Sequence, residues 1–79
     1  MEIELFQITY KDASLDVERF DISGQTFFRI SFPDKVPPLT ILRALNFEGA
    51  KFWTSMPEGR YQLAEEIGIL VEQYYRSIK

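Results

Sequence analysis

The chain has 79 residues, a net charge of −3, and neither cysteine nor histidine. A chain of this length forms one domain, and we treat residues 1–79 as that unit. The missing residue types exclude disulfides and thiolate–zinc sites, and they remove the commonest general base and metal ligand. We therefore expect a protein that is not an enzyme and has no catalytic residue, metal or cofactor. The negative charge argues against a DNA binder that works by simple phosphate neutralisation.

The N-terminal half of the chain alternates apolar and polar residues with the period of β-strands. The strands expected there span about residues 2–10, 15–22 and 25–32. In the second strand the alternation shifts phase at Glu18-Arg19, which suggests a β-bulge. The residues of the third strand that should face a helix and be buried are Phe28, Ile30 and Phe32.

Two further strands are expected at about 39–47 and 51–56, after a proline-rich loop. Their register is ambiguous. A two-residue turn would place Leu45 opposite Phe52, whereas a three-residue loop would place Arg43 opposite Trp53. The choice matters because a slip of one residue exchanges the two faces of a strand.

A helix is expected at about 57–78, since apolar residues recur there at steps of three and four. Its start fits a capping box that runs from Ser55 to Glu58, with Pro57 in the first turn. The seam that should pack on the sheet consists of Leu63, Ile67, Leu70, Val71 and Tyr74. Gly68 lies beside this seam and costs about 1 kcal/mol relative to alanine, which predicts a close approach of the helix to another element.

These elements predict an α+β fold, in which an antiparallel meander sheet of four to five strands packs against one C-terminal amphipathic helix. Aromatic residues with arginines between them form the candidate site on one sheet face, if the register allows it. Its members are Phe27, Arg29, Arg43 and Trp53. Such a face suits the stacking of single-stranded bases. The same residues also suit a dimer interface or a cation–π pair within the fold.

Self-association is the stabilising device that this composition leaves open to a small domain. Aromatic residues make up 15% of the chain, and both Phe27 and Phe28 are apolar although they lie on opposite strand faces. On the helix, Ile69 and Tyr75 lie off the centre of the apolar seam and widen it. We therefore predict a homodimer whose contact uses Phe27, Trp53, or the outer helix residues Ile69 and Tyr75.

The order of four or five strands followed by a final helix resembles two groups of single-stranded nucleic-acid binders. These are the positive-cofactor-four-like domains and the Pur-alpha repeats, which use a curved antiparallel sheet plus a helix and which pair their units. The resemblance implies the same fold and a nucleic-acid partner. The cations on the central strands here are Arg29, Arg43 and Lys51, fewer than those families carry, so no binding residue is transferred. Residues 51–68 also look like short uncharacterised proteins of gut anaerobes.

The sequence thus favours a small non-catalytic interaction module that acts as a homodimer. The alternative is a single-stranded nucleic-acid-binding domain that uses the aromatic and arginine face. The expected partners are a second copy, a protein, or single-stranded nucleic acid. No export signal or membrane-length apolar run is present, so we expect a cytoplasmic location without membrane contact.

Overall fold

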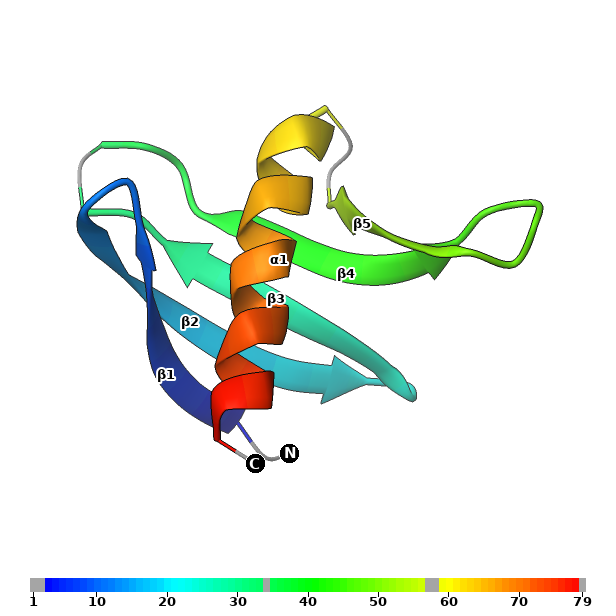
Figure 1. The fold of residues 1–79 in the computed structure, drawn as a ribbon, viewed down its shortest axis with the longest axis horizontal. Helices are drawn as coiled ribbons and strands as arrows, with labels where there is room; N and C mark the ends of the chain where they lie inside the picture. The colour runs from blue at the N-terminus through cyan, green and yellow to red at the C-terminus, as the bar shows by residue number, and fades with distance from the viewer. Residues whose placement is uncertain (1–2, 34, 57–58, 79) are drawn as a thin grey trace.

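Five antiparallel strands and one helix make up the computed structural model, which describes residues 3–33, 35–56 and 59–78 (Figure 1). The elements are β1 (Ile3–Tyr10), β2 (Ala13–Ile22), β3 (Gln25–Ser31), β4 (Leu39–Leu45), β5 (Lys51–Ser55) and α1 (Tyr61–Ser77). The strands follow one another in the sheet in chain order, which is a meander. The helix crosses one face of this sheet, so the predicted α+β fold with an antiparallel meander and a C-terminal helix is confirmed.

Two tight turns join the first three strands. Lys11 and Asp12 have φ values of 49° and 64°, and Ser23 and Gly24 have φ values of 51° and 82°. Positive φ at both central residues is the geometry of a two-residue turn whose twist matches that of the flanking strands. The turns therefore fix β1, β2 and β3 in one continuous register.

The β4–β5 hairpin has the register that places Arg43 opposite Trp53. Its loop is organised by Asn46, whose side-chain oxygen accepts hydrogen bonds from the backbone N–H groups of Glu48 and Ala50, each at 2.9 Å. This loop is longer than a two-residue turn, so the alternative that pairs Leu45 with Phe52 is wrong. In Figure 1 the hairpin extends away from the body of the fold.

The predicted bulge at Glu18-Arg19 is also wrong, because β2 pairs residue by residue with both of its neighbours. Strict alternation continues through this strand. Val17 lies under the helix and is buried, whereas Phe20 lies on the opposite face of the sheet. The phase shift in the sequence therefore marks the point where the apolar side chains change from one sheet face to the other.

The core lies between α1 and the sheet face that we call the helix face. Its buried members on the strands are Phe6, Ile8, Leu15, Val17, Phe28, Ile30, Leu39, Ile41 and Trp53, and on the helix Ala64, Ile67 and Val71. Phe28 and Ile30 are thus buried as expected, and Phe32 packs half-buried against this core. The rest of the predicted helix seam is half-buried and also packs against the core: Leu63, Leu70 and Tyr74.

The helix begins at Tyr61, four residues after the predicted start at residue 57. Its N-cap is Arg60, whose side chain makes no cap bond to the described part of the helix. Pro57 and Glu58 of the predicted box lie outside the described residues. Within the described chain, no helix has the length and apolar character needed to cross a membrane.

Gly68 lies directly against the indole ring of Trp53. A methyl group built on Gly68 would lie 2.5 Å from Cδ1 of that ring and closer still to Cγ and Cδ2. Ordinary carbon contacts are about 3.5–4.0 Å, so only glycine fits here without movement of the ring. The close approach that Gly68 predicts is confirmed, and the element approached is the sheet.

Candidate functional site

The four residues of the predicted aromatic and arginine face lie on two different sides of the sheet. Phe27 and Arg29 lie on the side away from α1, which we call the open face. Arg29 pairs with Thr40, so Thr40 lies on the open face. Arg43 is three residues further along β4, so alternation places it on the helix face, together with its pairing partner Trp53. The expectation of one shared platform is therefore wrong, and the two halves have to be considered separately.

On the helix face, Arg43, Trp53 and Glu72 form one connected cluster. The Arg43 guanidinium lies 5.2 Å from the centroid of the Trp53 ring. The Glu72 carboxylate accepts hydrogen bonds from Arg43 and from the indole Nε1–H of Trp53, the latter at 2.9 Å. Burial would raise the pKa of Glu72, but these two hydrogen bonds together with the charges of Arg43 and Arg76 outweigh burial and hold that pKa below its usual value. Arg43 and Trp53 thus form a cation–π pair within the fold, which is one of the alternatives the sequence left open.

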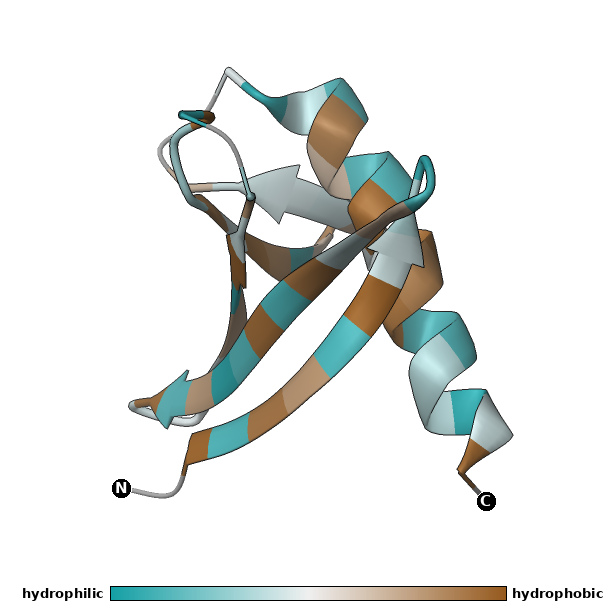
Figure 2. Cartoon of the chain, turned by 90° about the vertical axis from the view of Figure 1, so that its left-hand side faces the viewer, coloured by the Kyte–Doolittle hydropathy of each residue, from teal (hydrophilic) through white to brown (hydrophobic). Residues whose placement is uncertain are grey.

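The open face carries an apolar cluster at the end of the sheet where β1 begins. We call Ile3, Leu5, Phe20, Ile22 and Phe27 the open-face cluster. Ile3, Phe20 and Phe27 stand opposite one another across three strands, and the two phenyl rings stack at 5.6 Å between centroids. Leu5 is 73% exposed, Ile3 55% and Ile22 49%. Figure 2 shows apolar and polar residues interspersed along β1 and β2. The strand pairing places Leu5 and Ile22 on the open face, whereas Phe6 and Val17 lie on the helix face and are buried.

The middle of the open face has a hollow of about 500 Å³, and its lining includes Leu5 of the open-face cluster. Its charged lining is Asp16, Glu18 and Arg29, with Arg29 directly opposite Glu18 across β2 and β3. The Gln7 side-chain amide also donates a hydrogen bond to Asp16 at 2.8 Å. Arg29 therefore lies beside carboxylates, and the described part of this face has no continuous positive groove.

The two predicted contacts on the helix differ in their surroundings. Ile69 is 47% exposed on the outer side of α1. Tyr75 is half-buried, with its ring 5.5 Å from Phe6 and 6.2 Å from Phe28 between centroids, and its hydroxyl donates a hydrogen bond to Glu4. Burial, followed by the Glu4 carboxylate, raises the pKa of Tyr75. Tyr75 is thus part of the internal packing, and Ile69 is the more accessible of the pair.

Sequence reasoning missed four members of the open-face cluster and identified Phe27 alone. The available signal was the phase shift in β2, because Phe20 and Ile22 follow it with unbroken alternation. Among the described residues, no group of three or more carboxylates is placed to hold a metal ion.

Comparison of the chain with protein-family models, with curated proteins and with solved structures gives no match. The resemblance to positive-cofactor-four-like domains and Pur-alpha repeats therefore stays a prediction. The function has to be argued from the geometry of the described residues.

Proposed function

We propose that this protein is a non-catalytic interaction module that forms a homodimer through the open face of its sheet. The observation that carries the proposal is the open-face cluster. Three of its large aliphatic side chains are about half exposed or more, and they lie beside two stacked phenylalanines. Large contiguous apolar patches are unusual on monomeric soluble proteins and mark interaction sites. A cytoplasmic location, expected for an acidic chain without cysteines, belongs to this proposal.

The size of the patch suits a protein contact. An interface of ordinary size buries about 800 Å² on each partner. Ile3, Leu5 and Ile22 are about half exposed or more, whereas Phe20 and Phe27 are half-buried and supply a smaller part of such an area. On β4 and β5 the open face adds further apolar side chains, namely Leu42, Ala44 and Phe52. Burial of this surface would also stabilise a domain of only 79 residues, whose own core is small.

The open face carries charges of both signs, which a contact with a second copy can pair. A twofold contact brings the same surface together from both sides, so the surface must complement itself. Glu18 and Arg29 supply opposite charges side by side on neighbouring strands. In a twofold contact, Arg29 of one copy can approach Glu18 of the other while the apolar residues cover one another.

Single-stranded nucleic acid is a weaker candidate for this face. Asp16 and Glu18 outnumber Arg29, so the lining of the hollow is net acidic and would repel phosphates. Base stacking on Phe20 and Phe27 would have to overcome that repulsion. A titration with a fluorescent oligothymidine at low salt tests this alternative, and we expect no saturable binding below about 100 µM, the weak end of non-specific affinities.

Sedimentation equilibrium tests the proposed dimer. The wild type should approach twice the chain mass of 9.3 kDa as its concentration rises. Leu5→Glu places a charge in the open-face cluster at an exposed position, and it should weaken dimerisation by about 100-fold because an unpaired charge would be buried. Ile69→Glu is the matched control on the helix and should dimerise like the wild type. A wild type that stays monomeric at millimolar concentration, or a loss of dimer in Ile69→Glu alone, would contradict the proposal.

A further inference from the structure

A second, separate cavity lies on the helix face where β3 and β4 part. The β3–β4 ladder ends at the pair Phe28–Ile41, whereas the pairing of β2 with β3 continues to Gln25. Beyond that point, the start of β3, the β4–β5 hairpin and the C-terminal half of α1 enclose a cavity of about 330 Å³. This volume is at the lower end of the range of about 300–1,000 Å³ found for small-molecule sites.

The wall of this cavity is apolar and rich in aromatic rings. Phe28, Trp53, Val71 and Tyr75 line it. The Phe28 ring meets the Trp53 ring at 5.7 Å and the Tyr75 ring at 6.2 Å between centroids, in edge-to-face geometry. The Trp53 ring is held in place by its hydrogen bond to Glu72 and by contact with Gly68, so the wall is pre-formed. Rigid aromatic walls of this kind favour flat rings as ligands.

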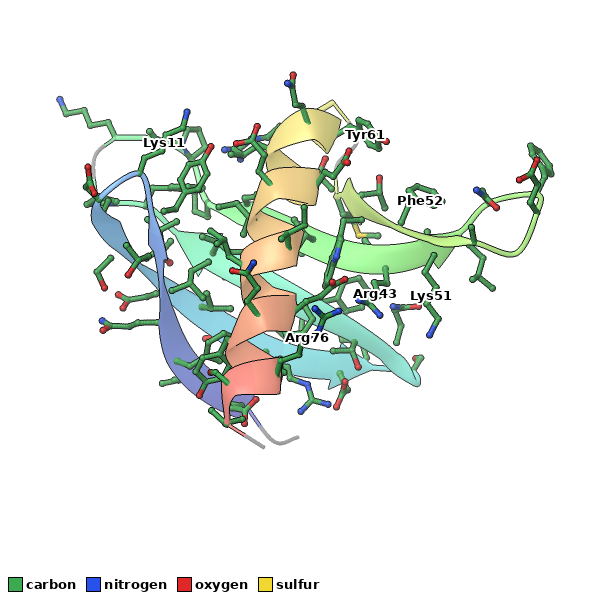
Figure 3. The ribbon with its side chains drawn as sticks, viewed as in Figure 1. Lys11, Arg43, Lys51, Phe52, Tyr61 and Arg76 are labelled. Carbon is green, nitrogen blue, oxygen red and sulfur yellow. The ribbon has the colours of Figure 1, made fainter. Side chains whose placement is uncertain are left out.

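The rim of the cavity is positively charged, although the chain as a whole has a net charge of −3. Arg43 and Arg76 line it together with Glu72. Lys51 lies on the same face as Trp53, two residues away on β5, and Figure 3 shows Arg43, Lys51 and Arg76 gathered between α1 and the hairpin. Glu72 is engaged by Arg43. The charge of Arg76, one turn further along α1, also acts on Glu72, but Arg76 forms no ion pair within the described part of the chain. Arg76 and Lys51 are therefore available to an anion.

We propose that this cavity binds a small ligand that combines a flat ring with an anionic group. The ring would pack against Tyr75 and the edge of Trp53 that lines the cavity, since Gly68 and Arg43 already contact the indole. The anion would take hydrogen bonds from the Arg76 guanidinium, with Lys51 adding charge. A guanidinium forms paired hydrogen bonds with carboxylate or phosphate, which gives such a ligand a defined orientation. The site is on the opposite side of the sheet from the open face, so it does not depend on the proposed dimer.

The single tryptophan provides a specific reporter for this cavity. The ¹H–¹⁵N spectrum has one indole Nε1–H signal, which belongs to Trp53. We would titrate uniformly labelled protein with phenyl phosphate, benzoate and uridine 5′-monophosphate, each of which has a ring and an anion. Inorganic phosphate supplies the anion alone, and benzyl alcohol supplies the ring alone. The ring-bearing anion that binds most tightly then identifies the anionic group of the ligand. Phenyl phosphate and the nucleotide represent phosphate-bearing ligands, and benzoate represents an aromatic carboxylate.

At least one ring-bearing anion should shift the Trp53 signal saturably with a dissociation constant below about 1 mM. Inorganic phosphate and benzyl alcohol should bind at least about tenfold more weakly, because each makes only half of the contacts. No saturable shift with any ring-bearing anion, or equal binding of benzyl alcohol, would overturn the proposal.

Two matched variants locate the anion. Arg76→Gln keeps a polar side chain at an exposed position, and it should weaken binding about tenfold by removing a charge-assisted hydrogen bond. Arg29→Gln removes the same charge from the open face and should bind like the wild type. Unchanged binding in Arg76→Gln, with a native spectrum, would contradict the assigned orientation.

A second copy of the chain is the other occupant to test. Phe47 is fully exposed at the tip of the β4–β5 hairpin and has the ring that such a cavity favours. If Phe47 of a second copy fills the cavity, the Trp53 signal will shift with protein concentration alone, and Phe47→Ser will abolish that shift. This result would overturn the small-ligand proposal, whereas a signal independent of protein concentration supports it.

Discussion

Replacement of Gly68 by alanine tests the helix-to-sheet contact that holds the Trp53 ring. The new methyl group would lie 2.5 Å or less from three atoms of that ring. Contact at a normal distance of about 3.5 Å requires the ring or the helix to move by about 1 Å. The ring has little freedom to move, because Nε1 donates to Glu72 at 2.9 Å and Arg43 lies over the ring.

The expected change in the free energy of unfolding is the difference between two opposing effects. Alanine stabilises a helix interior by about 1 kcal/mol relative to glycine. Overpacking of a rigid core site costs about 1–3 kcal/mol, and the fixed ring places this site at the upper end. The net destabilisation should be about 1–2 kcal/mol. In a domain of this size, each 1 kcal/mol corresponds to a fall of about 4–8 °C in the melting temperature.

Urea unfolding, followed by circular dichroism at one fixed protein concentration, measures this difference. The control is the same change in a Trp53→Ala background, with an osmolyte added to all four proteins so that the weakest stays folded. Without the ring, Gly68→Ala should instead stabilise the protein by about 1 kcal/mol. A Gly68→Ala single variant more stable than the wild type, or an equal loss in both backgrounds, would refute the close-contact explanation.

Three further outcomes follow from the described packing and hydrogen bonds. Phe28→Ala should cost about 3–5 kcal/mol in chemical unfolding, as large core truncations do, whereas Gln62→Ala at an exposed position of α1 should change stability by less than about 0.5 kcal/mol. Folding lowers the pKa of Glu72, so the contribution of this carboxylate to stability is complete above its unfolded pKa and is lost as the pH falls. The stability difference between wild type and Glu72→Gln should therefore shrink on acidification. Folding raises the pKa of Tyr75, so its contribution is complete below the unfolded pKa of about 10 and is lost as the pH rises above it. Melting curves between about pH 9 and 11 span that unfolded pKa of about 10. Over this range Tyr75→Phe should lose less stability than the wild type.

The elements could be predicted because their periods are local properties of the chain. Alternation identifies the strands, and the three- and four-residue steps identify the helix. Gly68 was informative for the same reason, since a costly glycine within an otherwise good helix points to a steric requirement. The start of the helix was less predictable, because Ser55, the expected cap, is the last residue of β5 and the helix begins at Tyr61.

The candidate site was harder to predict because face assignments depend on register between distant strands. Arg29 and Arg43 are separated by the proline-rich loop, and nothing in their own segments fixes how β3 and β4 align. The phase shift in β2 suggests a bulge, because one extra residue would return Phe20 and Ile22 to the face of Leu15 and Val17. The structure shows that alternation continues and that Phe20 and Ile22 occupy the other face. A regular strand with apolar residues on both faces therefore has the same local sequence pattern as a bulged strand with a single apolar face.

The most direct test of the open-face dimer uses the absence of native cysteines, since one introduced thiol then reports on one position. Leu5→Cys and Ile69→Cys place thiols on the open face and on the outer side of α1, at positions 73% and 47% exposed in the single chain. The rate of maleimide modification is measured for each variant over a range of protein concentrations. We predict that Cys at position 5 becomes protected as the concentration rises, while Cys at position 69 reacts at a constant rate. Equal and constant rates at both positions, or protection at position 69 alone, would contradict the open-face dimer.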